Sequence, residues 1–327
     1  MSRQILSFTC LVAVTTTVAI SQEMPSRPVS TYSIVALDPE TKELGVAVQS
    51  HWFSVGSVVP WAEAGVGAVA TQSFVKVDYG PDGLSLMKEG MTAGEALARL
   101  LSEDEGEAVR QVAMVDIRGN VAVHTGDRCI EAAGHQGGDN YSVQANLMEK
   151  SAVWPAMAEA FESAEGDLAD RMMAALEAAE SEGGDIRGRQ SAAMLIVNGT
   201  PTGIPWKDVV MDLRVEDHPE PLKQLKRLIR IHRAYDHANK GDQLLEKGDI
   251  ESALKEYDAA ARFYPENIEL PFWSGVTLAS SGRLDEALPI FKSVFGKDDR
   301  WRQLTPRLVK SELLPDDPEM MEAILNQ

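Results

Sequence analysis

The sequence predicts an α+β domain, in which two antiparallel sheets lie between layers of helices, followed by an all-α domain of helical repeats. The chain has 327 residues, a length typical of about two domains. Strand-like and helix-like patterns alternate over residues 31–218, and a 34-residue period follows residue 234. Hydrophobic residues make up 44% of the chain and charged residues 25%, which is ordinary for a globular protein and too apolar for a disordered one.

The N-terminus has the pattern of a targeting segment. An apolar stretch covers residues 5–20, Arg3 precedes it, and small residues stand at Ala19 and Ser21. These features predict a secretory signal peptide over residues 1–21 with cleavage after Ser21, and a membrane anchor is the alternative. We therefore expect an exported protein, periplasmic or secreted, with no membrane segment after cleavage, and a linker or propeptide over residues 22–30.

Two cysteines cannot make a disulfide framework, because Cys10 lies in the predicted signal peptide. The mature chain then has the single thiol of Cys129, which we expect to be buried and inert. His124, Cys129 and His135 match no standard zinc spacing, so we expect no metal and no cofactor.

The first half of the α+β domain, residues 31–218, begins with strands. Alternation over residues 32–36 and an apolar run over residues 44–48 flank a turn at residues 38–41 and predict a hairpin. The β pattern continues over residues 55–59 and 65–71. A helical pattern then covers residues 83–89 and 92–101, where Thr92 and Glu95 form a capping box.

The second half of that domain repeats the order of strands and helices. The predicted elements are a hairpin over residues 109–116 and 121–124, helices over 153–163 and 168–181, and strands over 191–197 and 212–215. Two antiparallel sheets between helix layers fit this order.

A basic helix is predicted over residues 219–233, with Asp217 as its N-cap. One face has apolar residues at helical spacing, and the other has five cations: Lys223, Lys226, Arg227, Arg230 and Arg233. The basic face is either a docking surface for a partner or, as we favour, a solvated face that complements an acidic neighbouring domain. Residues 31–218 supply that acidity, with 30 acidic and 13 basic side chains.

Residues 234–327 have the 34-residue period of tetratricopeptide (TPR) repeats. The matched pairs are Gly241 and Gly275, Gly248 and Gly282, Ala253 and Ala287, and Tyr257 and Phe291. The period predicts helices over residues 234–247, 250–263, 268–281 and 284–295, and a degenerate segment over 301–313 that caps the stack. An unrelated pair of helical hairpins is the alternative.

Six segments of the first domain, in order along residues 31–235, carry a family resemblance. They are TYSIVALD at 31–38, ELGVAVQS at 43–50, VVPWA at 58–62, AGVGAVATQ at 64–72, RGRQSAA at 187–193 and DLRVEDHP at 212–219. Together they resemble the DUF1028 family of uncharacterised proteins. That family is placed with the N-terminal nucleophile (Ntn) hydrolases, so the resemblance implies a four-layer αββα sandwich and, less firmly, an amide-bond hydrolase.

Thr31 is the residue that the resemblance marks as a nucleophile. In an Ntn hydrolase the hydroxyl of the first residue attacks a carbonyl, and its own α-amino group accepts the proton. An α-amino group suits this role because its pKa is roughly 7.7–8.0, close to neutral pH. Thr31 stands at the start of the first predicted strand, where such a nucleophile belongs. The alternative is an ordinary threonine at a strand start.

The sequence departs from the Ntn pattern in two ways. Cleavage after Ser21 leaves residues 22–30 ahead of Thr31, so a second cut between Ser30 and Thr31 is required, by self-cleavage or by a protease. No lysine occurs between Lys42 and Lys76, so the nucleophile has no lysine on an early strand to tune it.

Further residues are candidates for the site, each with a purely structural alternative. Ser50 and His51 end the second strand and could act on protons, and Asn146 could donate its amide to an oxyanion. For substrate binding, Thr71 and Gln72 end the third β run, near the place where Ntn sites take backbone donors for an oxyanion. Arg187 and Arg189, next to Gln190, could clamp a substrate carboxylate. The structural alternatives are a lone hydrogen-bonding histidine, a turn asparagine and salt-bridged loop arginines.

Charge excludes several classes of partner. The net charge of −19 and the pI near 4.7 argue against nucleic-acid binding and against attachment to anionic lipid. We expect either an exported Ntn-type hydrolase that acts on an amide bond of a small molecule or peptide, or a non-catalytic Ntn-fold adaptor. In both cases the TPR-like domain binds a protein partner or forms a homodimer.

Overall fold

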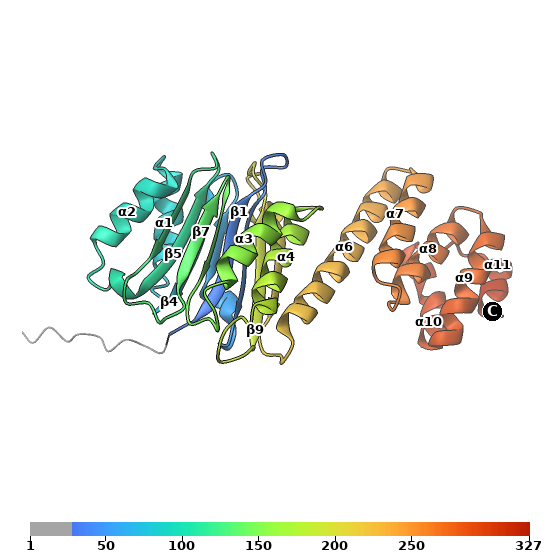
Figure 1. Cartoon of the computed structure of the whole chain (residues 1–327). Helices are drawn as coiled ribbons and strands as arrows, with labels where there is room; N and C mark the ends of the chain where they lie inside the picture. Colours follow the sequence, from blue (N-terminus) through green and yellow to red (C-terminus); the bar gives the residue numbers. More distant parts are fainter. Residues whose placement is uncertain (1–27) are drawn as a thin grey trace, which may run out of the picture.

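The computed structural model describes residues 28–327. The predicted signal peptide over residues 1–21 and most of the predicted linker therefore lie outside the described residues. In the described part, sheets and their covering helices occupy one end of an elongated molecule, and a stack of helices occupies the other (Figure 1). The helix α6 (Pro221–Glu246) connects the two ends.

The first part of the chain forms two antiparallel sheets. One has the strand order β10-β9-β2-β1-β8-β7: Val209–Val215, Ser191–Val197, Leu44–Ser50, Thr31–Leu37, Tyr141–Ala145 and Gly134–Gly138. The other has the order β3-β4-β5-β6: Pro60–Glu63, Gly67–Ser73, Arg110–Asp116 and Val121–Thr125. The strand β1 lies near the middle of the first sheet and contacts β4 and β5 of the second.

Helices cover the outer face of each sheet. The four-stranded sheet is packed against α1 (Tyr79–Lys88) and α2 (Ala93–Ser102), and the six-stranded sheet against α3 (Val153–Ser163) and α4 (Leu168–Ser181). The capping box of Thr92 and Glu95 is present at the start of α2, as predicted. The described structure is thus a mixed α+β arrangement whose two sheets have apolar cores on both faces.

Alternation along β1 decides which side chains face the second sheet. Val35 and Leu37 belong to the apolar cluster between the sheets, whereas Tyr32 and Ile34 pack against the outer helices. Since successive side chains of a strand point to opposite faces, Thr31 and Ser33 share the face of Val35. The strand therefore carries its two polar side chains into the space between the sheets.

The structure differs from the predicted elements at two places in this region. The segment 55–59, predicted as a strand, contains a short 3-10 helix, Val55–Ser57, and the strand β3 begins at Pro60. The strands β7 and β8 were not predicted; β8 pairs with β1, so Asn146 follows a buried strand instead of lying in a loop. Gly134–Gly138 lacks any apolar alternation, because this strand is an edge strand with exposed side chains.

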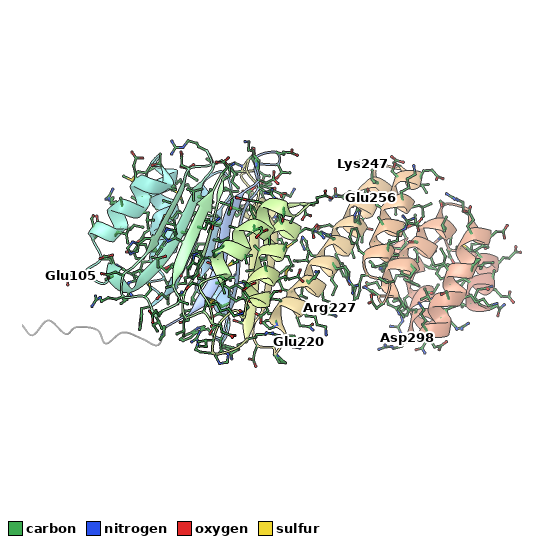
Figure 2. The ribbon with its side chains drawn as sticks, in the orientation of Figure 1. Glu105, Glu220, Arg227, Lys247, Glu256 and Asp298 are labelled. Carbon is green, nitrogen blue, oxygen red and sulfur yellow. The ribbon has the colours of Figure 1, made fainter. Side chains whose placement is uncertain are left out.

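The predicted basic helix and the first predicted repeat helix are one continuous helix. The helix α6 runs without a break from Pro221 to Glu246, and Glu220, Arg227 and Lys247 mark its course from the sheets to the repeats (Figure 2). Its apolar residues over 222–229 pack against the core of the six-stranded sheet, and β9 and β10 lie beneath it. The prediction of a separate helix ending at residue 233 is therefore wrong, because nothing in that stretch interrupts helical hydrogen bonding.

The basic face of α6 meets acidic side chains of α4. Lys226 Nζ lies 2.8 Å from Glu177 Oε1, and Arg233 Nη2 lies 2.7 Å from Asp167 Oδ1. Exposed ion pairs of this kind contribute only about 0–1 kcal/mol each. These pairs add little stability, but they agree with the interpretation that the basic face complements an acidic neighbouring domain.

The second part of the chain consists of stacked helices. After α6 come α7 (Ile250–Phe263), α8 (Glu269–Ser280), α9 (Leu284–Lys297), α10 (Arg300–Leu304), a 3-10 helix at Thr305–Ser311 and α11 (Pro318–Leu325). Gly241 faces the ring of Tyr257, and 34 residues later Gly275 faces the ring of Phe291. The turns at Gly248 and Gly282 have nearly the same positive φ, 79° and 81°. The period seen in the sequence is thus a repeated packing contact.

Within residues 28–327, no helix combines the length and the apolar character that a membrane span needs.

The two equivalent glycines predict different outcomes for the same substitution. A Cβ on Gly241 would lie 2.6 Å from the Tyr257 ring, which is held by a 2.6 Å hydrogen bond to Asp242, whereas a Cβ on Gly275 would lie at a tolerable 3.4 Å. We expect Gly241→Ala to destabilise the repeats by roughly 1–3 kcal/mol through overpacking. We expect Gly275→Ala to be neutral or to stabilise by up to about 1 kcal/mol through helix propensity. Urea denaturation of both variants measures the difference, and equal effects would contradict it.

Candidate functional site

Thr31 lies at a polar end of the space between the two sheets. Toward the far end of β1 this space is filled by Val35, Leu37 and other apolar side chains, but around Thr31 it is filled by amides and hydroxyls. Thr31 itself has no exposed surface. A buried polar cluster of this size in a β core is stable only if its groups are hydrogen-bonded.

Three amide side chains from both sheets connect around Thr31. The Thr31 carbonyl oxygen accepts hydrogen bonds from Gln72 Nε2 and from the Asn146 backbone N–H, each at 3.1 Å. Gln111 Oε1 accepts from Gln72 Nε2 at 2.7 Å and from Asn146 Nδ2 at 2.9 Å. The network extends to Ser33, whose hydroxyl donates to Gln72 Oε1 at 2.6 Å. The amides thereby fix the first residue of β1 against the second sheet.

The residues just before Thr31 fill the remaining space as a short extended segment. Val29 pairs with Ser73 at the end of β4, through Val29 N to Ser73 O at 2.7 Å and Ser73 N to Val29 O at 3.0 Å. The Thr31 hydroxyl donates to Val29 O at 2.7 Å. Val29 and Ser30 are buried, so residues 28–30 belong to the packed site, unlike a free linker.

The carbonyl oxygen of Ser30 is held by two side-chain donors. Ser50 Oγ donates to it at 2.5 Å, and Arg187 Nη2 donates at 2.9 Å. The guanidinium is oriented by Asp185, which accepts from its Nε at 3.0 Å and from its Nη2 at 2.7 Å. Asp185 is buried and also accepts from the His51 backbone N–H at 3.2 Å. A fixed hydroxyl and a fixed cation thus polarise the carbonyl of the Ser30–Thr31 bond.

Backbone strain and unpaired polar atoms occur at this site, as they do at several other places in the described chain. Ser73 and Leu147 adopt positive φ angles of 70° and 57°, which bulky residues rarely accept. Among the described residues, the buried atoms Ser30 Oγ, Ser73 Oγ and Asn146 Oδ1 have no hydrogen-bond partner. Such departures from ideal geometry are typical of functional sites.

A surface pocket of about 490 Å³ opens beside this segment. The residues that line it include Pro28, Arg187 and the aromatic residues Trp52 and Phe53. Phe53 is 64% exposed, an unusual position for a phenylalanine. The pocket therefore leads from solvent to the segment that precedes Thr31.

Comparison with known families identifies the first part of the chain. A family model described as a family of unknown function, DUF1028, matches residues 31–225. The chain belongs to the DUF1028 family. The match begins at Thr31, so the segment 28–30 that occupies the site lies outside the region shared with the family.

Two solved structures resemble this DUF1028 chain. The crystal structure of the protein SPO2555 from Silicibacter pomeroyi, described as DUF1028, is 31% identical with a TM-score of 0.55, over 62% of this chain and 88% of that one. Anbu, an ancestral β-subunit from Yersinia bercovieri, is 13% identical with a TM-score of 0.30, over 60% of this chain and 92% of that one. No curated protein matches the chain.

Six of the nine predicted site residues lie around the segment 28–31 of this DUF1028 chain. Thr31, Ser50, Gln72, Asn146 and Arg187 make the hydrogen bonds described above, and His51 joins through its backbone and lines the pocket. The His51 side chain is exposed, and its ring is not hydrogen-bonded to the cluster in the described structure.

The other three predicted residues have different partners. The Thr71 hydroxyl donates to Lys76 O at 3.1 Å, on the face of β4 opposite to Gln72. Arg189 pairs with Glu180, which also accepts from the Tyr32 hydroxyl, on the helix-covered face of β1. Burial, followed by the charge of Glu180, holds the pKa of Tyr32 well above its usual range. Gln190 lines the pocket but bonds to Asp217 at 3.1 Å. Thr71 is separated from Thr31 because it points to the other face of β4. Arg189 and Gln190 are separated from it by the conformation of their loop, which the sequence pattern does not predict.

A second pocket, of about 480 Å³, contains two residues of the rejected zinc pattern, Cys129 and His135. Cys129 is half-buried, not fully buried as expected, and its thiol donates to Arg110 O at 3.3 Å. Burial raises the pKa of this thiol, which keeps it protonated at neutral pH. In residues 28–327 no three His, Cys, Asp or Glu side chains gather in a way that could hold a metal ion.

Sequence reasoning missed Gln111, Asp185 and Ser33. Two of them have a signal in the sequence: Gln111 and Ser33 are polar residues in otherwise apolar strands, on the face that β alternation points inward. Asp185 lies two residues before Arg187, and only the loop geometry reveals that it orients the guanidinium.

The amide network predicts a large loss of stability from one substitution. Gln111→Ala leaves Asn146 Nδ2 without its acceptor and removes the hydrogen bonds that Gln111 Nε2 donates to Thr125 Oγ1 and to Ala145 O. We expect a fall of roughly 2–5 kcal/mol in the free energy of unfolding, since each unpaired buried group costs about 1–3 kcal/mol. Gln136→Ala, on the exposed face of β7, is the matched control and should change stability by less than about 0.5 kcal/mol. Equal effects in chemical denaturation would refute the role of Gln111.

Proposed function

We propose that this DUF1028 chain is an exported Ntn-type hydrolase that acts on amide bonds, with Thr31 as its nucleophile once the Ser30–Thr31 bond has been cut. The arrangement of two sheets between helices supports an αββα sandwich of the Ntn kind. The position of Thr31 supports its role, because it is the first residue of a central strand and faces the space between the sheets.

In the proposed reaction the free α-amino group of Thr31 accepts the proton of its own hydroxyl, which attacks the substrate carbonyl. The acyl group passes to Thr31 Oγ1 while the leaving amine takes the proton, and water then releases the acid. The donors that now hold Ser30 O, namely Ser50 Oγ and Arg187, would hold the oxygen of the substrate carbonyl as negative charge develops on it.

The observation that carries the proposal is the environment of the Ser30 carbonyl. A backbone carbonyl beside a strand usually accepts from a backbone N–H, but this one accepts from a hydroxyl at 2.5 Å and a guanidinium at 2.9 Å. Two such donors lower the barrier to attack on that carbonyl. The nearest nucleophile in sequence is the Thr31 hydroxyl.

This environment favours self-cleavage over an outside protease. The Thr31 Oγ1–carbon bond forms at the Ser30 carbonyl, the peptide C–N bond breaks, and the hydroxyl proton passes to the Thr31 nitrogen. Water then hydrolyses the resulting ester, which leaves a Ser30 carboxylate and restores the Thr31 hydroxyl. An outside protease would first have to extract Val29 and Ser30, which are buried.

A second candidate function is a non-catalytic Ntn-fold scaffold that recruits a protein partner through its repeats. The repeated contact of Gly241 with Tyr257 and of Gly275 with Phe291 supports TPR-like units. Stacked units of this kind present an extended surface to partners, and a homodimer through the same surface is a further option. In this case a chain that keeps residues 22–30 would be fully functional.

The N-terminus of the purified protein tests the proposed function. We expect intact-mass analysis of protein from an exporting host to find chains that begin at Thr31, and Thr31→Ala chains that begin at Gln22. Ser50→Ala and Arg187→Lys should slow the cut by roughly 10²–10³-fold, the usual cost of one lost oxyanion donor. Arg189→Lys is the matched control, because Arg189 pairs with Glu180 away from Ser30.

Three outcomes would contradict this proposal. If chains beginning at Gln22 hydrolyse amides, or if Thr31→Ala keeps the activity, the Thr31 mechanism is wrong. If Ser50→Ala and Arg187→Lys are processed as fast as the control, the cut is made by another protein.

A further inference from the structure

The segment 28–30 shows what the acyl side of the site accepts. In the uncut chain these residues lie on the side of Thr31 that its hydroxyl faces, since Thr31 Oγ1 donates to Val29 O at 2.7 Å. A substrate carbonyl attacked by the same oxygen must lie where the Ser30 carbonyl lies now. Once residues 28–30 have been removed, a bound substrate would therefore make the contacts that Val29 and Ser30 make in the uncut chain.

The first of these contacts requires a peptide backbone. Ser73 offers both its N–H and its carbonyl to the residue that precedes the attacked carbonyl, at 3.0 and 2.7 Å. Ser73 is buried at the end of β4 and pairs with Arg110 of β5, so strand pairing holds it in place. An amide without a backbone N–H and carbonyl at that position would leave these two groups unpaired, at about 1–3 kcal/mol each.

The second contact selects an apolar side chain. Val29 is 1% exposed and belongs to the apolar cluster between the sheets. A charged side chain there would be buried without a partner, which is far more costly than the loss of apolar contact.

The third contact selects a small residue at the attacked carbonyl. Ser30 is fully buried, and its hydroxyl has no partner among the described residues. Nothing therefore recognises the hydroxyl itself, so alanine should fit as well as serine. Beyond Val29, the pocket of about 490 Å³ with Trp52 and Phe53 offers apolar surface to the residues further from the cut.

We infer that the substrate of this site is a peptide, bound as an extended strand against Ser73 and cut after a small residue that follows an apolar residue. This inference rests on the proposed function and narrows its substrate from amides in general to peptides. It also separates this site from one for small-molecule amides, which could use the donors on the carbonyl but not those of Ser73.

The test uses the chain that begins at Thr31, obtained by self-cleavage or from a ubiquitin fusion cut by a deubiquitinase. Every strand and helix of the described chain lies within residues 31–327, so this form contains all of them. The substrates are acetyl-Pro-Val-Ala-aminomethylcoumarin, the same peptide with Lys in place of Val, and acetyl-Ala-aminomethylcoumarin. We expect kcat/KM to fall by roughly 10–200-fold for the lysine peptide and for the truncated amide.

A depsipeptide separates the backbone contact from the side-chain contact. It replaces the valine N–H by an ester oxygen and keeps the side chain, so it loses only the hydrogen bond to Ser73 O. We expect roughly a 10-fold fall in kcat/KM, since the buried acceptor is left unpaired. Equal hydrolysis of the depsipeptide and the peptide, or equal hydrolysis of acetyl-Ala-aminomethylcoumarin and the full peptide, would overturn the inference while the proposed function stands.

A binding measurement distinguishes failure of the inference from failure of the proposed function. The product acetyl-Pro-Val-Ser should bind the Thr31 chain at least about 10-fold more tightly than acetyl-Pro-Lys-Ser, as measured by calorimetry. If the chain hydrolyses no amide but keeps this preference, the site for an extended peptide is real and the hydrolase proposal fails. If it binds neither peptide and still cleaves small amides, the hydrolase proposal stands and the inference of a peptide substrate fails.

Discussion

The site depends on one constraint: a polar cluster buried between two sheets must satisfy its own hydrogen bonds. Gln111 meets that constraint by accepting from Gln72 and Asn146, while both of these donate to the carbonyl of Thr31. The first residue of β1 is thus tied to both sheets. If the amides around the start of β1 were apolar, no hydrogen bonds would hold Thr31 in place between the sheets. Because Ser30 directly precedes Thr31, its carbonyl lies next to this network, where Ser50 and Arg187 donate to it.

The helices after α6 form a second module, which lies away from the site around Thr31. The helix α6 is shared: its first half packs on β9 and β10, and its second half is the first helix of the repeats. Because a continuous helix transmits orientation, the repeats are set at a defined angle to the sheets, and the ion pairs of Lys226 and Arg233 with α4 support that angle. The repeats therefore lie at the opposite end of the molecule from much of the sheet core (Figure 1).

Much of the fold follows from local patterns, and the exceptions have identifiable causes. The sequence predicts several features from local patterns. They are the strands with one apolar face, the helix with a capping box and the 34-residue period. The edge strand β7 was missed because its side chains face solvent on one side and glycines weaken its signal. Of the site, Thr31 and its neighbours at strand ends were predictable from their positions. Gln111 was not singled out, although alternation points it inward.

Residues close together in the chain were enough to indicate the family, most of the strands and helices, the 34-residue period and the candidate nucleophile Thr31. The surroundings of the Ser30–Thr31 bond are visible only in the folded structure. Ser50, Ser73, Gln111 and Arg187 come from four separate segments, and their hydrogen bonds to residues 29–30, Gln72 and Asn146 depend on strand register and loop geometry that no local pattern encodes. The reason is physical: propensities act over a few residues, whereas a buried polar site is assembled by pairing strands that are far apart in the sequence.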